Sequence, residues 1–176
     1  MSFARVRALA VVAALAVAAV VFVVVAMVRD SQSNAKAQPG CPAGFVRAAV
    51  DLPKQQDVKV RIFNGTDVPG LGQQLAGEFR NRRFQVDQRV TTASRRFNGV
   101  ALLQFGPMGV GSAHLLRAYF LGAQPRYEPG RKGAVVDITV GAGYQKLSTT
   151  TEVNQAISAL GEPELPPRAC PISADR

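Results

Sequence analysis

One stretch near the middle of the chain alternates hydrophobic and polar side chains from Val58 to Phe63, which is the period of a strand with one buried face. The glycine-rich stretch Asn64–Gly72 then predicts a turn, because asparagine and glycine tolerate the backbone angles that turns need. Leu71, Leu75 and Phe79 recur every fourth residue and therefore share one face of a predicted helix. The segment thus predicts a strand and a helix whose hydrophobic faces pack together.

The rest of the chain shows the same two periods. Strands are predicted at residues 84–90, 100–105 and 134–140, an edge strand at 123–128, and helices at 109–121 and 149–160. Residues 45–50 fit an extra strand or a short helix equally well. The order βαββαβ predicts an α+β fold, in which helices cover one face of a small mixed sheet. A ferredoxin-like split βαβ unit is one topology that satisfies this order.

A long apolar run precedes this domain. Residues 8–28 contain no charged or polar side chain, and as a helix they span about 30 Å, the hydrocarbon thickness of a bilayer. We therefore expect one transmembrane helix. The alternative is a cleaved signal peptide, whose apolar region is shorter, about 7–15 residues. Arg5 and Arg7 precede the run, so the positive-inside rule predicts a single-pass protein of the cell membrane with a cytoplasmic N-terminus and an extracytoplasmic domain.

These patterns divide the chain into five parts. The predicted order is a cytoplasmic tail at residues 1–7, the transmembrane helix at 8–28, a linker and lead-in segment at 29–56, the α+β domain at 57–161, and an extended proline-rich tail at 162–176. The small polar residues at the start of the linker are typical of a flexible connection.

The chain has two cysteines, Cys41 and Cys170, one on each side of the predicted domain. In an oxidising compartment a disulfide between them would close a loop of about 130 residues and stabilise the fold by about 4–5 kcal/mol on the chain-entropy model. Two unpaired thiols are the alternative. Neither cysteine has a second cysteine or a histidine nearby, so no metal site is expected.

The part of the chain after the apolar run is strongly basic. It carries 19 basic and 12 acidic residues, a formal excess of +7. This excess predicts anionic partners, which outside a cell membrane are acidic wall polymers or lipid head groups. The predicted topology excludes nucleic acid as a partner. The alternative is that the arginines form a solvated surface without a ligand.

The residues that most enzymes need are scarce in this sequence. His114 is the single histidine, and its position off the apolar helix face predicts a side chain that faces solvent. No Gly-x-Ser-x-Gly elbow is present, and neither cysteine has a base nearby. Asp137 lies in a predicted strand, where we expect it to pair with an arginine or to face solvent. We therefore predict that the protein is not an enzyme and has no catalytic residue, no cofactor and no metal.

Two features carry the candidate ligand site. The turn Asn64–Gly72 lacks the residues of a P-loop, but N–H groups at the start of a predicted helix can bind an anion. Arginines end the same helix, where they also interact favourably with the helix dipole. The alternatives are a plain capping turn and a solvated basic surface. The predicted ligand-binding residues are Asn64, Gly65, Thr66, Gly70, Arg80, Arg82 and Arg83.

The same stretch resembles a known family. The residues Val60–Thr66, Val68–Leu71 and Arg83–Val86, followed by Val136–Gly141 with Tyr144, are similar to the LytR C-terminal domain. The resemblance covers residues 57–145 and identifies the α+β domain as a member of this family.

The resemblance implies an extracytoplasmic domain that is often joined to LytR-CpsA-Psr enzymes, which transfer glycopolymers to the cell wall. We expect no such catalytic domain in a chain of 176 residues. A single N-terminal anchor, this domain alone and flanking cysteines resemble actinobacterial envelope integrity proteins. The expected function is therefore non-catalytic support of cell envelope integrity, by binding an anionic cell-wall polymer or membrane lipid. The alternative is a protein–protein adaptor for the membrane proteins of envelope synthesis or transport.

Overall fold

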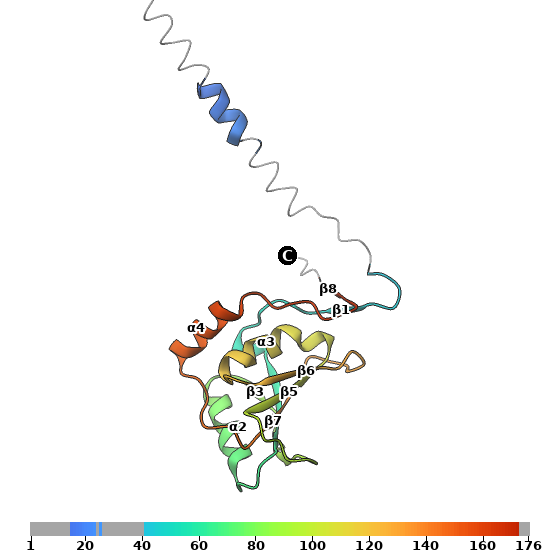
Figure 1. Ribbon diagram of the computed structural model, residues 1–176, viewed down its shortest axis with the longest axis vertical. Helices are drawn as coiled ribbons and strands as arrows, with labels where there is room; N and C mark the ends of the chain where they lie inside the picture. The colour runs from blue at the N-terminus through green and yellow to red at the C-terminus, as the bar shows by residue number, and fades with distance from the viewer. Residues whose placement is uncertain (1–14, 24, 26–40, 173–176) are drawn as a thin grey trace, which may run out of the picture. The chain divides into compact units, whose positions relative to one another are not determined.

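The computed structural model describes residues 15–23, 25 and 41–172 of the chain (Figure 1). Two compact units divide the chain between Gly40 and Cys41. In the first unit the described residues are helical, and much of the predicted transmembrane helix at 8–28 lies outside them. Within the described ranges, no helix has both the length and the apolar character that crossing a membrane requires. The elements below belong to the second unit, Cys41–Arg176.

A mixed sheet of six strands lies at the centre of this unit. Its order is β3-β2-β7-β5-β6, and β4 also pairs with β2. The pair β5–β7 is antiparallel and the other pairs are parallel. The prediction of a mixed sheet is confirmed, and β6 is an edge strand, as its proline predicts. The strands are β2 (Lys59–Asn64), β3 (Gln85–Val86), β4 (Thr91–Thr92), β5 (Ala101–Phe105), β6 (Gln124–Tyr127) and β7 (Val136–Val140).

Two helices connect neighbouring strands of the sheet. Helix α2 (Leu71–Asn81) joins β2 to β3, and α3 (Val110–Tyr119) joins β5 to β6. The two strands of each pair are hydrogen-bonded to each other, so neither βαβ unit is split. The ferredoxin-like topology is therefore wrong. The strand between the two units is β7, the last of the six sheet strands along the chain, and all five of its residues are buried, as a central position requires.

Both helices cover the same face of the sheet, which confirms that part of the prediction. Phe79 of α2 stacks on Phe120, which follows α3, with ring centroids 5.7 Å apart. Short 3-10 helices precede β2 and α3, at Gln55–Asp57 (η1) and Pro107–Gly109 (η2). The most deeply buried residues, each at most 1% exposed, include Val60, Ile62, Leu103 and Ile138 from the sheet and Leu75, Phe79, Leu116 and Phe120 from the helical layer.

Helix α4 (Thr150–Leu160) packs against α3 and begins with the predicted capping box. The backbone N–H of Thr149 donates to Oε2 of Glu152 at 2.6 Å, and the N–H of Glu152 donates to Oγ1 of Thr149 at 3.4 Å. The segment after α4 then covers His114, which is 7% exposed and has Nε2 3.0 Å from the carbonyl oxygen of Gly161. The prediction of a solvent-facing histidine is wrong, because the C-terminal segment buries a helix face that the local pattern leaves open.

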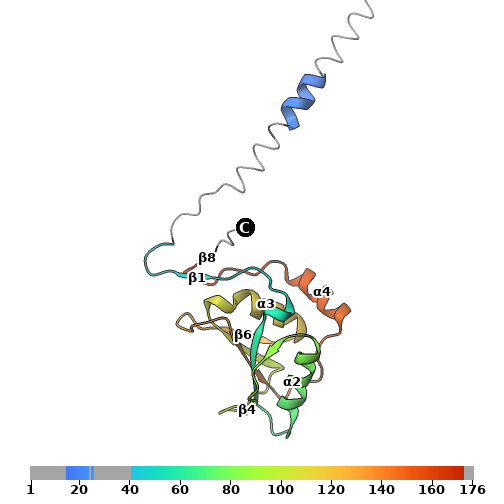
Figure 2. The same cartoon turned by 180° about the vertical axis from the view of Figure 1, so that it is seen from behind.

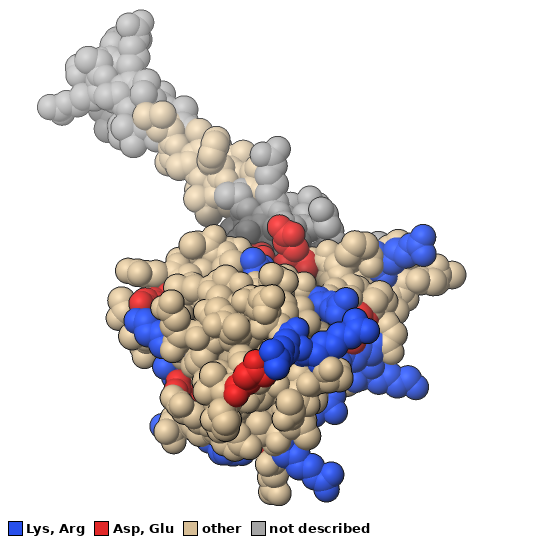
Figure 3. Space-filling model, turned by 60° about the horizontal axis from the view of Figure 1, so that its bottom comes forward, with Lys and Arg blue, Asp and Glu red and all other residues tan. Residues whose placement is uncertain are grey.

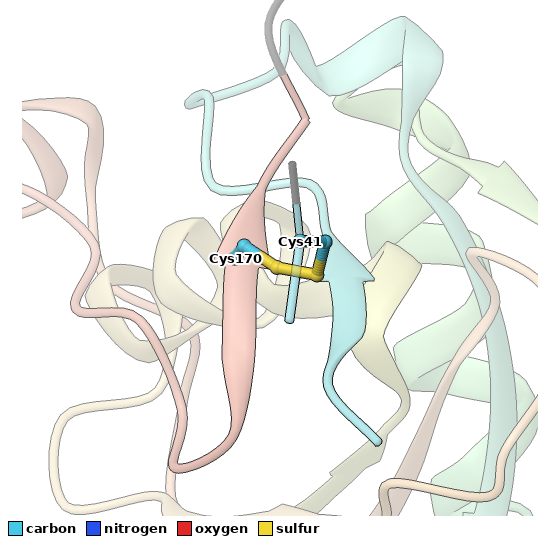
Figure 4. Close-up of a disulfide and its surroundings, with 2 residues drawn as sticks. All are labelled: Cys41 and Cys170. Carbon is cyan, nitrogen blue, oxygen red and sulfur yellow. A yellow bond between two sulfur atoms is a disulfide. The ribbon is translucent and has the colours of Figure 1, made fainter. Parts of the chain in front are cut away.

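The two ends of the unit are held together. Strand β1 (Val46–Ala48) pairs in parallel with β8 (Ala169–Pro171), so the lead-in segment contains a strand rather than a helix. A disulfide joins Cys41 to Cys170, whose Cα atoms are 5.9 Å apart, and Figure 4 shows it beside β8. The predicted disulfide is confirmed, and the alternative of two free thiols is wrong.

Candidate functional site

The second face of the sheet carries no helix in the part of the chain that the structure describes. It is formed by the alternate residues of the strands, which point away from α2 and α3. Strand pairing places Arg61, Asp137, Gln104 and Arg126 in one row across β2, β7, β5 and β6. We call this surface the open face.

One half of the open face is electrically balanced. Arg61 binds the carboxylate of Asp137 through two hydrogen bonds, with Nε 2.8 Å from Oδ1 and Nη2 2.9 Å from Oδ2. Arg131 contacts Oδ2 of Asp137 and also pairs with Glu128. The hydrogen bond with Asp137 raises the pKa of Arg61, so the guanidinium stays charged. Asp137 thus pairs with arginine, the first of the two predicted alternatives, and this half presents little net charge.

The other half of the open face is hollowed into a cavity of about 630 Å³. Three arginines line it and no acidic residue does. Arg96 also pairs with Asp67 at 2.7 Å, but both side chains are largely exposed. Within residues 41–172, Arg95 and Arg126 make no ion pair. We call this cavity the arginine groove; its lining is Ala93, Ser94, Arg95, Arg96, Phe97, Leu102, Gln104, Gln124, Pro125, Arg126 and Thr139.

The loop that carries Arg95 and Arg96 is fixed to the ends of β2 and β7. The N–H of Phe97 donates to the carbonyl of Gly65 at 2.9 Å, and the N–H of Ala142 donates to the carbonyl of Phe97 at 2.8 Å. At one end of the loop, the N–H of Ala93 donates to the carbonyl of Asn64 at 2.8 Å. The arginines therefore extend from a loop whose backbone is already positioned.

Glycines make room for the aromatic wall of the groove. A Cβ atom on Gly99 or on Gly141 would lie 2.6 Å from the ring of Phe97, closer than real Cβ contacts occur. A Cβ on Gly65 would lie 2.8 Å from the carbonyl oxygen of Val140. All three glycines, Gly65, Gly99 and Gly141, lie close to Phe97, and we call them the glycine bed. Their small size has a clear structural cause that does not require a ligand.

The predicted turn at Asn64–Gly72 is closed by its own side chains. Oδ1 of Asn64 accepts hydrogen bonds from the N–H and hydroxyl of Thr66, at 3.0 and 2.8 Å, and Nδ2 donates to the carbonyl of Val68 at 2.8 Å. Gly70 has a left-handed φ of 78° immediately before α2. The turn therefore positions the start of α2, and its part in binding stays a prediction.

The three predicted arginines at the end of α2 have different surroundings. Nη1 of Arg82 donates to the carbonyl of Ser148 at 2.6 Å, and its guanidinium lies 5.6 Å from the ring centroid of Tyr119. Arg80 is exposed and lines a cavity of about 370 Å³ together with Arg89. Arg83 is exposed and has a positive φ of 68°. Arg82 is thus engaged in packing, and the ligand role of all three stays a prediction.

The candidate site predicted from the sequence does not include Arg95, Arg96 or Arg126, which line the groove. The available signal was a basic pair before a buried strand. Arg126 lies 30 residues later and reaches the groove because β5 and β6 pair in parallel, with Gln104 opposite Arg126. Nothing local in the sequence reveals that register.

The described residues contain no cluster of three His, Cys, Asp or Glu side chains that could hold a metal ion. A second cavity, of about 400 Å³, lies between α3 and the segment after α4, with His114 and Arg117 among its lining residues. Burial raises the pKa of Tyr144 to about 12 and also raises the pKa of Tyr127, so both hydroxyls stay protonated near neutral pH.

The architecture defines a class: a mixed α/β domain, closed by a disulfide, with helices on one face of its sheet and a basic groove on the other. The fold is similar to that of the soluble domain of a conserved hypothetical secreted protein from Mycobacterium marinum. The two share 20% sequence identity with a TM-score of 0.52, over 68% of this chain and 82% of the other. No curated protein matches the sequence significantly.

Residues 57–144, half of the chain, match the family described as LytR cell envelope-related transcriptional attenuator. The chain therefore belongs to the LytR C-terminal domain family, as its residues predict.

Proposed function

We propose that this protein is a membrane-anchored, extracytoplasmic and non-catalytic protein that supports the integrity of the cell envelope, a counterpart of the actinobacterial envelope integrity protein Cei. Family membership supports the cell-envelope assignment. The disulfide between Cys41 and Cys170 supports an oxidising compartment, because such bonds persist mainly outside the cytoplasm. The apolar run at residues 8–28 supplies the anchor.

The proposed activity is binding of an anionic polymer of the wall or an anionic lipid surface. The observation that carries it is the arginine groove, which is lined by three arginines and no acidic residue, and in which Arg95 and Arg126 make no ion pair within residues 41–172. Guanidinium groups bind phosphate and carboxylate through paired hydrogen bonds. The rest of the open face is balanced by Asp137 and Glu128, so the unmatched charge is concentrated at the groove.

The small free energy of each ionic contact favours a ligand that carries several charged groups. An exposed ion pair contributes about 0.2–1 kcal/mol, so a single anion would be held weakly. Once one charge of a larger ligand is bound, the next contact forms within the same complex, and the affinities combine. Binding should therefore be multivalent and sensitive to salt.

The test is a retention assay with the full chain in detergent, against purified cell wall, vesicles of phosphatidylglycerol and solubilised membrane proteins. We expect retention on wall or vesicles that falls between about 0.1 M and about 1 M salt, as the Debye length shrinks from about 10 to about 3 Å. Capture of one membrane protein that persists at high salt, without retention on either anionic surface, would instead establish the adaptor role and overturn this proposal.

A further inference from the structure

We propose that the occupant of the arginine groove is a linear anionic polymer of the cell wall, rather than the surface of the membrane that holds the anchor. This inference rests on the proposed function and adds the site and the class of ligand. Three observations carry it: the position of the groove in the domain, the chemistry of its lining, and its size.

The loop of the groove that carries Arg95 and Arg96 and the N-terminal end of the domain lie at opposite ends of β5. Strand β1 is tied to the chain just after β5, because the N–H of Ala49 donates to the carbonyl of Pro107 at 3.0 Å. The loop precedes β5, and from it the groove runs along the strand past Leu102 to Gln104. Figures 1 and 2 agree, since β1 and β8 lie at the top of the domain and β4 lies near its bottom in Figure 2.

Basic side chains gather at the end of the domain that carries the groove. Figure 3 brings this end forward and shows more Lys and Arg than Asp and Glu on it. A chain that arrives from a membrane enters the domain at Cys41, beside β1 and β8. The basic end therefore lies at the end of the domain opposite to Cys41, where the chain enters it.

The lining suits a ligand in which charged and neutral groups alternate. Arg95 extends from the loop before β5, and Arg126 belongs to the edge strand β6, so the two unpaired guanidinium groups come from separate elements. Phe97 supplies an aromatic surface, and Gln124 and Thr139 supply an amide and a hydroxyl group. Gln104 adds its amide oxygen, since its Nε2 donates to Oε1 of Glu128 at 2.9 Å. The arginines recognise phosphate or carboxylate groups, and the amides and hydroxyl suit the alcohol groups of a sugar or polyol between them.

The volume agrees with a short segment of polymer. Ligand-binding cavities generally measure about 300–1,000 Å³. At about 630 Å³ the groove is far larger than one phosphate ion requires. It is also open to solvent along the loop, where Arg95 and Arg96 are exposed, so a chain can continue beyond the groove at its ends.

The experiment measures binding of the full chain, in a neutral detergent, to labelled oligomers by fluorescence anisotropy. The probes are oligo(glycerol phosphate) for phosphodiesters, oligogalacturonate for carboxylates, and dextran oligomers as a neutral control. Vesicles of phosphatidylglycerol form a separate arm. The test variant is Arg95→Glu with Arg126→Glu, and the matched control is Arg47→Glu with Arg89→Glu, which changes the net charge equally at exposed arginines outside the groove and outside the predicted ligand-binding residues.

We expect the wild type to bind at least one charged oligomer and to ignore dextran. The groove variant should bind about tenfold more weakly, a loss that two exposed charge contacts can supply, whereas the control should change by about threefold or less. The preferred charged oligomer identifies the anionic group. If the double variant fails to fold, Arg126→Gln on the exposed edge strand provides the same comparison with Arg89→Gln.

Three outcomes would overturn the inference. Equal losses in the groove variant and the control would assign binding to net charge alone and leave the proposed function intact. Binding to vesicles without binding to either oligomer, weakened in the groove variant but not in the control, would assign the groove to lipid and again preserve anion binding. Absence of binding to wall oligomers and vesicles alike at low salt would remove both the inference and the proposed function.

Discussion

On one face of the central sheet, Val60, Leu103 and Ile138 pack beneath α2 and α3, and each is at most 1% exposed. On the other face, Arg61 and Asp137 of the same strands form an ion pair, and the side chain of Arg61 is 45% exposed. Side chains on the covered face gain stability from burial, at about 1.5–3 kcal/mol for a large apolar group. Exposed charges on the open face contribute less than about 1 kcal/mol each. Alternate residues of the same strands thus build the core on one face of the sheet and a charged surface on the other.

The largest test of this division removes an aromatic side chain from the covered face. Phe79 is fully buried and contacts the rings of Phe84, Tyr119 and Phe120. Phe79→Ala should lower the free energy of unfolding by about 3–5 kcal/mol, measured by urea unfolding of the full chain in detergent.

The control for this change is Phe45→Ala, because Phe45 is 43% exposed. Its cost should stay within about 0.5 kcal/mol. Similar losses for both phenylalanines would show that burial beneath the helices does not dominate the stability of the domain.

The next test breaks the balanced half of the open face. Asp137→Asn leaves Arg61 and Arg131 without their shared carboxylate, and the side chain of Asp137 is only 11% exposed. We expect a loss of about 1.5–3 kcal/mol in the free energy of unfolding, the range for hydrogen bonds to charged groups. The exposed Asp51 provides the control, as Asp51→Asn. An Asp137→Asn protein as stable as the Asp51→Asn protein would mean that solvent already screens this network.

A third test connects stability to recognition through the glycine bed. Gly141→Ala places a Cβ atom 2.6 Å from the ring of Phe97 and 2.1 Å from the carbonyl oxygen of Gly99, so the loop must shift. The expected cost is about 1–3 kcal/mol, together with weaker binding of the anionic oligomer by the protein that remains folded. The control is Gly130→Ala, where an added Cβ meets nothing within 4 Å. Unchanged affinity in folded Gly141→Ala would show that the position of the loop does not matter for binding.

The smallest effect concerns the capping box of α4 and depends on pH. Hydrogen bonding to the Thr149 N–H lowers the pKa of Glu152, so its contribution to stability is present above the unfolded pKa and is lost as the pH falls through the folded pKa. Between about pH 7 and pH 3, a window around the ordinary glutamate pKa of about 4.3, the melting temperature of the wild type should therefore fall more than that of Glu152→Gln. Parallel melting curves for the two proteins would show that the charge of Glu152 contributes nothing.

The elements of the fold followed from local patterns, because burial of one face imposes a visible period on strands and helices. The alternation at Val58–Phe63, the fourth-residue spacing of Leu71, Leu75 and Phe79, and the capping box before α4 each predicted the element that the structure contains. Local patterns do not show which strands lie next to each other in the sheet. The position of β7 between β2 and β5 depends on contacts between residues far apart in the chain, and the ferredoxin-like topology was wrong for that reason.

The same limit applies to the candidate site. The sequence drew attention to the turn at Asn64 and to Arg82, but the structure uses the side chains of both in internal hydrogen bonds. The arginine groove depends on a parallel register that brings Arg126 to the loop of Arg95, and no local pattern encodes it. His114 is a further example: the local pattern predicts an exposed side chain, but a segment almost 50 residues later in the chain buries it.

The disulfide between Cys41 and Cys170 has a mechanical consequence. Tension on the segment before Cys41 divides at this residue, with one path running through β1 and the other crossing the sulfur bridge into β8. A pull therefore loads both ends of the fold together, and β1 cannot be peeled away on its own. At the opposite end, the grip on a polymer would consist of ionic contacts that break and re-form. Under the proposed binding mode, rising load therefore breaks these ionic contacts before it breaks the covalent bridge that joins the two ends of the fold.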